Sequence, residues 1–229
     1  MKYSLFVCLI AAGLALVTPR PRAQTSALQQ GIRVQMASSN NAVAFPVADT
    51  ADAWIIAVTV EGHLYFGVTP VTRDELLQEM RRTPRKREAK LYLKSDARTP
   101  YANVEGALDA ARHDLFATVV LLTSRPGSHP PGTMAPPEGL EVGIVSPSSS
   151  ASPTVEMLSS GHGSAGLKID GHEASLSTLE GDLQQALQDG NGKVVLVQAD
   201  GEVPFAEVVR VIDSCRTIGA TPVLAGPGL

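Results

Sequence analysis

The stretch that decides the fold reads Val194-Val195-Leu196-Val197-Gln198-Ala199-Asp200-Gly201-Glu202-Val203-Pro204-Phe205. Its apolar, β-branched first part predicts a buried strand that ends at Asp200. Pro204 suits the first turn of a helix, where its missing N–H is not needed. The apolar side chains that follow recur at i, i+3, i+7 and i+10 and predict one buried helix face; they are Phe205, Val208, Ile212 and Cys215.

The same strand and helix occur earlier in the chain. Leu91-Tyr92-Leu93-Lys94-Ser95-Asp96 ends in an aspartate, and Pro100-Tyr101 follows at the same distance as Pro204-Phe205. From the aspartate onward the two copies align without a gap. Asp109 and Arg112 of the first copy then match Asp213 and Arg216 of the second. An internal repeat of this kind predicts that one structural unit occurs twice.

Upstream segments extend the repeat. Gly31-Ile32-Arg33-Val34 matches Gly139-Leu140-Glu141-Val142, and the hairpin signal Val60-Glu61-Gly62-His63 matches Ile169-Asp170-Gly171-His172. Each copy then has a Ser/Thr-x-x-Glu pattern, which predicts a capping box at the start of a helix. The two predicted boxes are Thr72 with Glu75 and Ser177 with Glu180.

These patterns predict an α/β (α+β) protein of two tandem small two-layer domains. Each domain is expected to have a mixed sheet and two helices, in the order strand, hairpin, helix, strand, helix, strand. The predicted domains span residues 31–126 and 139–229. Residues 127–138 are rich in Pro and Gly and are expected to be a linker.

Residues 1–27 are expected to be a signal peptide or a short N-terminal anchor. The uncharged run from Tyr3 to Val17 has the length of a signal-peptide apolar region and is short for a spanning helix. A cleaved signal predicts a periplasmic protein. A retained segment predicts a single N-terminal anchor in the inner membrane.

Composition excludes several classes of protein. The net charge is −4, and residues 139–229 carry four basic and eleven acidic groups, so we expect no nucleic-acid binding. The two cysteines are too few for a disulfide framework or a cysteine zinc site. The sequence has no Gly-rich phosphate loop after a strand, no serine nucleophile elbow and no His-Glu-x-x-His. We therefore expect no catalytic residues, no metal and no cofactor.

In its order of elements the chain resembles the ExbD/TolR family of biopolymer-transport proteins. The resemblance covers the periplasmic domain of that family twice. In the first copy it depends on Gly31 to Val34, Tyr65 to Thr72, and Ser95 to Tyr101. In the second copy it depends on Leu179 to Leu187 and Gln198 to Gly219. The most specific part of the resemblance is a strand that ends in an aspartate. Three residues later a proline and an aromatic residue follow, and a helix begins there.

The resemblance implies a small α/β domain that dimerises and works with ExbB/TolQ-type and TonB/TolA-type envelope proteins or with peptidoglycan. Such family members carry an aspartate in their membrane helix, whereas the run from Tyr3 to Val17 has none. An intramembrane carboxylate is needed to carry a proton, so this chain is not expected to conduct protons itself. Two fused copies are expected to form either a homodimer of chains or an intramolecular pseudo-dimer.

The resulting hypothesis is a non-enzymatic periplasmic accessory or scaffold protein in envelope energy transduction coupled to the proton motive force. It would support biopolymer transport by binding protein or peptidoglycan. One alternative is a membrane-anchored ExbD-type transporter subunit beside an ExbB/TolQ-like partner. Another is a protein that binds a small ligand between its two domains.

Three sets of residues follow from this reasoning. Asp96 and Asp200 are expected to accept hydrogen bonds from turn amides. Leu121, in the last strand of the first copy, is expected either to contact a partner or to be buried in the core. The basic cluster is expected to attract an anionic partner or to lie solvated at a helix end; its members are Arg81, Arg82, Arg85, Lys86 and Arg87.

Overall fold

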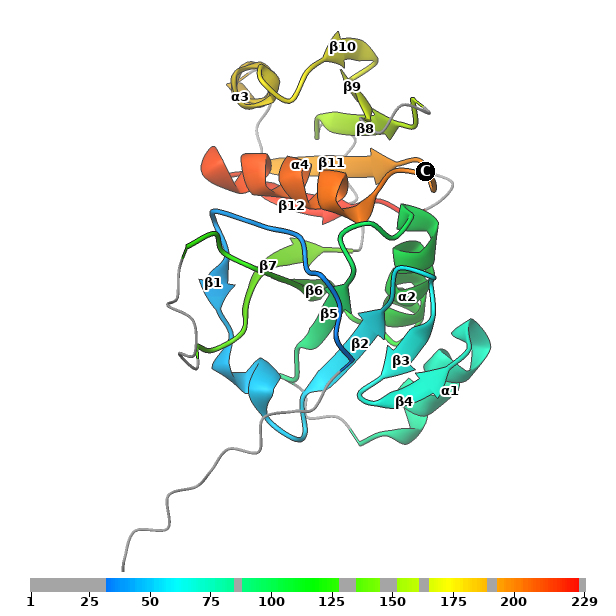
Figure 1. The fold of residues 1–229 in the computed structure, drawn as a ribbon. Helices are drawn as coiled ribbons and strands as arrows, with labels where there is room; N and C mark the ends of the chain where they lie inside the picture. Colours follow the sequence, from blue (N-terminus) through cyan, green and yellow to red (C-terminus); the bar gives the residue numbers. More distant parts are fainter. Residues whose placement is uncertain are drawn as a thin grey trace, which may run out of the picture.

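The computed structural model describes residues 32–84, 88–127, 135–144, 152–160, 165–188 and 193–226. Their strands form one mixed sheet, in the order β10-β9-β8-β11-β12-β7-β6-β5-β2-β3-β4, with β1 paired to β7 beside this path. Figure 1 shows the first half of the chain at one end of the sheet and the second half at the other, with β7 between them. The predicted α/β class with a mixed sheet is confirmed.

The two halves of the sheet have the same element order. The first half comprises β2 (Trp54–Val58), β3 (Leu64–Phe66), β4 (Thr69–Val71), α1 (Arg73–Arg82), β5 (Leu91–Ser95), α2 (Tyr101–His113) and β6 (Thr118–Thr123). The second comprises β8 (Thr154–Leu158), β9 (Gly166–Ile169), β10 (His172–Ala174), α3 (Leu179–Gln188), β11 (Val194–Ala199), α4 (Phe205–Thr217) and β12 (Thr221–Leu224). Outside the repeat lie β1 (Val43–Ala44), the 3₁₀ helix η1 (Pro46–Asp49) and β7 (Glu138–Gly143).

Strand pairing is also the same in the two halves. β5 pairs in parallel with β2 and β6, as β11 pairs in parallel with β8 and β12. β3 pairs antiparallel with β2 and β4, as β9 pairs antiparallel with β8 and β10. This is the topology that duplication of one unit would produce. The division into two tandem domains stays a prediction, because the strands of both halves belong to one continuous sheet.

The main core lies where buried side chains of α1, α2, α3 and α4 meet one face of the sheet. The predicted apolar faces of α2 and α4 are buried there, with Tyr101, Val104, Phe205 and Ile212 each at most 1 % exposed. A second, smaller cluster lies on strands β2, β5 and β6, where Ala48 of η1 covers Ile55, Tyr92, Val120 and Leu122. The segment from Met36 to Ala53 therefore covers part of the sheet face opposite the α-helices.

Strand β7 joins the halves. It pairs antiparallel with β6 over six residues and in parallel with β12 through the single pair Gly143–Val223. Gly139 is needed here, because a Cβ at this position would lie 2.6 Å from the carbonyl oxygen of Leu121. The last residue of the predicted linker 127–138, Glu138, is therefore the first residue of β7. Residues 128–134 of the linker lie outside the described residues.

Two predictions about local structure are wrong. Residues Ile32, Arg33 and Val34 form no strand, although their supposed counterpart does lie in β7. The turn at Asp170 and Gly171 joins β9 to β10, whereas Val60 to His63 joins β2 to β3, so the two turns are not equivalent. The true counterpart of Gly171 is Gly67, which joins β3 to β4. Both glycines have positive φ, a conformation that glycine adopts without steric cost.

Candidate functional site

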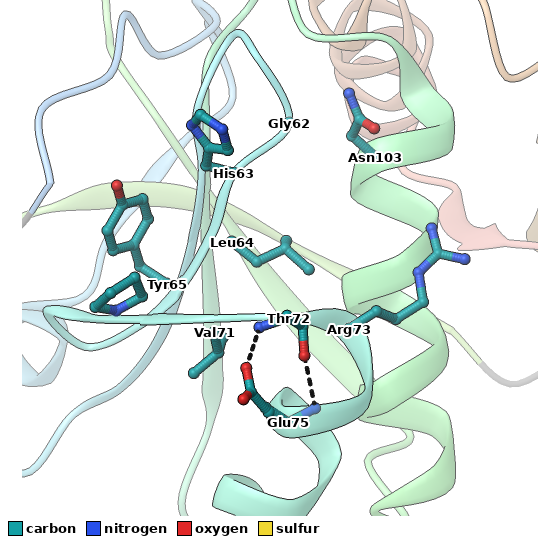
Figure 2. A pocket seen from close by; sticks show the side chains of 10 residues that line it. Gly62, His63, Leu64, Tyr65, Val71, Thr72, Arg73, Glu75 and Asn103 are labelled. Carbon is teal, nitrogen blue, oxygen red and sulfur yellow. Dashed lines mark hydrogen bonds between the residues drawn. The ribbon is translucent and has the colours of Figure 1, made fainter.

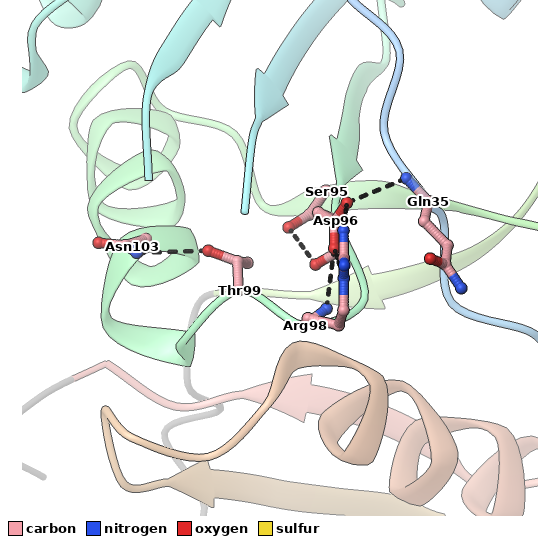
Figure 3. A network of polar contacts seen from close by, with 6 residues as sticks. All are labelled: Gln35, Ser95, Asp96, Arg98, Thr99 and Asn103. Atoms are coloured by element: carbon pink, nitrogen blue, oxygen red, sulfur yellow. Dashed lines mark hydrogen bonds and ion pairs between the residues drawn. The ribbon is translucent and has the colours of Figure 1, made fainter. Parts of the chain in front are cut away.

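The turn after β5 is built around the carboxylate of Asp96. This side chain is 4 % exposed and accepts hydrogen bonds from the backbone N of Gln35 (3.1 Å), the backbone N of Arg98 (3.1 Å) and the Arg98 guanidinium (3.0 and 3.2 Å). Figure 3 shows Gln35 and Arg98 converging on it. The bonds from Arg98, followed by that from Gln35, lower the pKa of Asp96 despite its burial. Asp96 is therefore a fixed anion that holds the turn.

Asp200 occupies the equivalent turn after β11. Its carboxylate accepts from the backbone N of Ser159 at 3.0 Å, so it ties the turn to the end of β8. The backbone of the two turns repeats closely, because Thr99 N donates to Asp96 O (3.2 Å) and Val203 N donates to Asp200 O (3.0 Å). Both aspartates thus accept hydrogen bonds from backbone amides.

The helices that follow these turns begin without a side-chain cap. The N-cap residues are Pro100 and Pro204, and neither makes a side-chain hydrogen bond to its helix. The first N–H groups of a helix have no partner within the helix and need acceptors elsewhere. In this structure the acceptors are carbonyl groups of the other half of the chain.

The exchange is reciprocal, and donors and acceptors occupy equivalent positions in the two halves. The four bonds run from Tyr101 N to Val203 O (2.9 Å), Phe205 N to Thr99 O (2.9 Å), Ala102 N to Gly201 O (3.0 Å) and Ala206 N to Ala97 O (2.8 Å). An isolated antiparallel bridge between Pro100 and Pro204 lies between them. When residue i of one unit contacts residue j of another and j of the first contacts i of the second, the two units are related by a two-fold axis. We call these two turns the paired turns.

Two matched arginines strengthen the junction. Arg112 of α2 donates to the carbonyls of Ile144 (2.7 Å) and Leu224 (3.1 Å), and Arg216 of α4 donates to the carbonyl of Glu141. Residues 141 and 144 lie in β7 and at its end. Equivalent side chains from both helices thus bind the strand between the two halves.

A strap of residues 39–41 is bound to α4 by Asp213. The Asp213 carboxylate accepts from Ser39 Oγ (2.6 Å), Asn40 N (2.9 Å), Asn41 N (3.0 Å) and Asn41 Nδ2 (3.1 Å). Sequence reasoning missed this contact. In the sequence, Asp213 and Arg216 match Asp109 and Arg112 of the first copy. This match indicated that the four residues have a role, but it did not show which residues they contact.

An open cleft of about 610 Å³ lies between the β3–β4 hairpin and the helices α1 and α2. Figure 2 shows His63 and Tyr65 on the hairpin side and Arg73 and Asn103 on the helix side. These side chains offer a cation, an aromatic ring and an amide, which suits binding of a polar ligand or peptide. Glu75 is engaged in the helix cap and does not add a free base to the cleft.

The predicted capping residues have different outcomes. At α1, Thr72 Oγ1 accepts from Glu75 N (3.3 Å) and the Glu75 carboxylate accepts from Thr72 N (2.8 Å), a complete capping box. At α3 the predicted box of Ser177 and Glu180 is wrong. Here Ser175 N donates to Thr178 Oγ1 (3.3 Å) and Leu179 N donates to Ser175 O (2.9 Å), so Ser175 and Thr178 make the bonds of the turn before α3.

Leu121 is buried in the core and is inaccessible to a partner. It is 0 % exposed and lies in β6, which is paired with β5 on one side and β7 on the other. Of its two expected roles the structure shows burial in the core, because β7 of the same chain occupies the edge of β6 that a partner would use.

The basic cluster is only partly described. Arg81 and Arg82 lie exposed in the last turn of α1, and Arg82 forms an ion pair with Glu79 at 3.0 Å. Arg85, Lys86 and Arg87 lie outside the described residues.

Within the described ranges, no group of three or more His, Cys, Asp or Glu side chains is placed to hold a metal ion. Cys215 is fully buried, and burial raises the pKa of its thiol to about 12, so it is no nucleophile. His63 and His172 are exposed beside turns. None of the helices in the described part of the chain has the length and apolar character needed to cross a membrane.

The fold defined by these observations is a pseudo-two-fold α/β protein whose two halves cap each other's helices. Residues 132–224 match the family model of biopolymer transport protein ExbD/TolR. The predicted resemblance is confirmed for this part of the chain, and the resemblance of the first copy stays a prediction. No curated protein and no solved structure matches the chain. The family domain suggests a role in envelope-associated energy transduction for biopolymer transport, and proteins of this family generally work with ExbB/TolQ-type and TonB/TolA-type partners and are not enzymes.

Proposed function

We propose that this chain is a non-enzymatic, exported accessory or scaffold protein of envelope energy transduction, built from two ExbD/TolR-like units fused into an intramolecular pseudo-dimer. The first unit is residues 31–126 and the second is residues 139–229. The single observation that carries the proposal is the reciprocal hydrogen bonding of the paired turns, seen together with the family match of the second unit.

A chain that supplies both halves of a two-fold arrangement leaves its outer surfaces, and not its junction, for other molecules. The cleft of Figure 2 is one such surface, because it is open and exposes polar side chains of the β3–β4 hairpin and of α1 and α2. We assign binding of an envelope protein or peptidoglycan to this outer surface.

The test is capture of defined partners by the full chain. Purified chain is mixed with peptidoglycan sacculi, and separately with ExbB/TolQ-type and TonB/TolA-type proteins of the same cell. We expect co-sedimentation or co-purification with at least one of them. Capture of none of them would contradict the proposal.

A matched pair of glycine variants tests whether the junction matters. A Cβ on Gly201 would lie 3.0 Å from the Cβ of Ala102, so the branched side chain of Gly201→Val is expected to crowd the contact between the paired turns. A Cβ on Gly181 in α3 meets nothing within 4 Å, so Gly181→Ala is the control. We expect Gly201→Val to lose capture and Gly181→Ala to keep it. Equal capture by both variants would show that the pseudo-dimer does not organise the binding surface.

We also propose that the basic cluster contacts an anionic partner, because of its positive charge. Arg81 and Arg82 are exposed in the last turn of α1, and a cluster of five basic residues carries more positive charge than helix capping requires. Replacing all five basic residues of the cluster with Gln should weaken sedimentation with sacculi at low salt. Unchanged sedimentation would exclude this contact.

A further inference from the structure

A small cavity lies on the sheet face opposite the α-helices. Its volume is about 170 Å³, and its floor is formed by strands β2, β5 and β6. The described residues that line it are predominantly apolar; they are Ile32, Met36, Ala48, Asp49, Ile55, Ala57, Gly67, Lys94, Leu122, Ala135, Pro137 and Glu138. An engineered apolar cavity of about 150 Å³ is large enough to bind benzene, so this one has room for a ligand of that size.

Lys94 is the sole cation among these lining residues. It lies on β5 opposite Ala57 of β2, so the two side chains share one face of the sheet. Burial lowers the pKa of Lys94, and no neighbouring charge acts to restore it. No described residue forms a hydrogen bond or an ion pair with its amine. A half-buried amine without a partner is costly, and an anion bound beside it would remove that cost.

The two carboxylates at the cavity do not satisfy this amine. Glu138 lies at the start of β7, is 13 % exposed at its side chain and faces Arg125, with Oε2 and Nε 3.7 Å apart. Asp49 ends the 3₁₀ helix η1 and forms no ion pair with Lys94. The cavity therefore combines an apolar floor with the Lys94 amine, which no described residue pairs, and with the Asp49 carboxylate, which does not pair with that amine.

We propose that this cavity binds a small monocarboxylate with an apolar tail, with the carboxylate on the Lys94 amine and the tail against Ile55, Ala57 and Leu122. A charge-assisted hydrogen bond to the amine would supply the selectivity for an anion. The apolar floor would supply the preference for a tail of about six carbons or one aromatic ring. This site is separate from the paired turns and from the cleft of Figure 2.

The test measures binding of benzoate and hexanoate to the full chain by calorimetry or by ligand-detected NMR. Benzyl alcohol and benzylamine serve as neutral and cationic probes of the same size. Lys94→Met removes the charge and keeps the length of the side chain. Lys168→Met is the matched control, because Lys168 also lies on a strand but does not line the cavity.

We expect benzoate and hexanoate to bind at least tenfold more tightly than benzyl alcohol, and benzylamine not to bind. Lys94→Met should lose at least tenfold in carboxylate affinity, and Lys168→Met should bind as the parent does. Ala57→Leu, which fills the floor and leaves the charge, should also lose binding while the protein keeps a cooperative thermal transition. Equal binding of benzoate by Lys94→Met, equal binding of benzoate and benzyl alcohol, or no carboxylate binding at millimolar concentration would each overturn the proposal. None of these outcomes bears on capture of envelope partners, so the two proposals fail separately.

Discussion

Removing the Asp213 carboxylate should release the strap of residues 39–41 from α4. Asp213→Ala abolishes four hydrogen bonds, of which the shortest is 2.6 Å from Ser39 Oγ. A hydrogen bond to a charged group contributes about 1.5–3 kcal/mol when it is buried. Asp213 is only partly buried, and water can replace several of these partners in the variant. We therefore expect a loss of about 2 kcal/mol in the free energy of unfolding, and about 1 kcal/mol for Asp213→Asn, which keeps one acceptor oxygen.

Two measurements check this magnitude. Chemical denaturation gives the free energy of unfolding, and hydrogen exchange reports the protection of the Asn40 and Asn41 amides. Asp182→Ala is the control, because Asp182 is exposed on α3 and should change stability by less than about 0.5 kcal/mol. A loss below about 0.5 kcal/mol for Asp213→Ala, with unchanged exchange at Asn40 and Asn41, would refute the reasoning.

The same carboxylate predicts a dependence on pH. Burial alone would raise the pKa of Asp213, but the hydrogen bonds from Ser39, Asn40 and Asn41 outweigh it and lower the pKa. The folded state then binds the proton less readily than the unfolded state does. The stabilisation is complete above the ordinary aspartate pKa of about 3.9 and is lost as the pH falls below it. Parent and Asp213→Asn should therefore differ in stability at pH 7 and converge as the pH falls toward 2.

Four further perturbations follow from the structure. Leu121→Ala should lower the free energy of unfolding by about 3 kcal/mol in urea, because it leaves a cavity in a fully buried site; a loss under 1 kcal/mol would contradict that packing. Gly139→Val should lower the melting temperature by several degrees, because its Cβ meets the Leu121 carbonyl oxygen at 2.6 Å; an unchanged melting temperature would mean that β7 moves freely. Cys215 should resist a thiol reagent at pH 8 and react once the protein is unfolded, because the pKa of the buried thiol is about 12. Tyr101→Phe should keep or raise stability by up to about 1 kcal/mol in thermal denaturation, because the buried Tyr101 hydroxyl has no hydrogen-bond partner among the described residues and Phe205 occupies the equivalent position.

Elements with side-chain periodicity could be predicted from the sequence. The i, i+3, i+7 spacing that begins at Tyr101 and Phe205 predicted α2 and α4, and both apolar faces are buried. The Thr72 and Glu75 box predicted the start of α1 correctly because both of its hydrogen bonds depend on residue types at fixed spacing. The second box was misplaced because Ser175, Ser177 and Thr178 are all capable of capping, and residue type alone does not choose among them.

The junction could not be predicted, because it is made mainly by the backbone. The bonds between the paired turns use the N–H and C=O groups of residues such as Ala97, Gly201 and Ala206, and those groups are the same in every sequence. Pro100 and Pro204 gave a partial signal, since a helix that begins after proline has no side-chain cap and must find another acceptor. The cavity beside Lys94 was equally hidden, because its roof is formed by Met36 and Ala48, which lie outside any periodic pattern.

The position of β7 explains why the two halves differ despite their common topology. The edges of β6 and β12 face each other across the pseudo-two-fold axis, and one strand fills the space between them. β7 runs antiparallel to β6 and parallel to β12. It pairs with the edge of β6 over six residues and with the edge of β12 through one residue pair. The counterpart segment, which begins at Ile32, has no equivalent edge left, and instead its Gln35 is bound in the Asp96 turn. The strand that begins the second unit thus pairs with the last strand of the first unit and joins the two into one sheet.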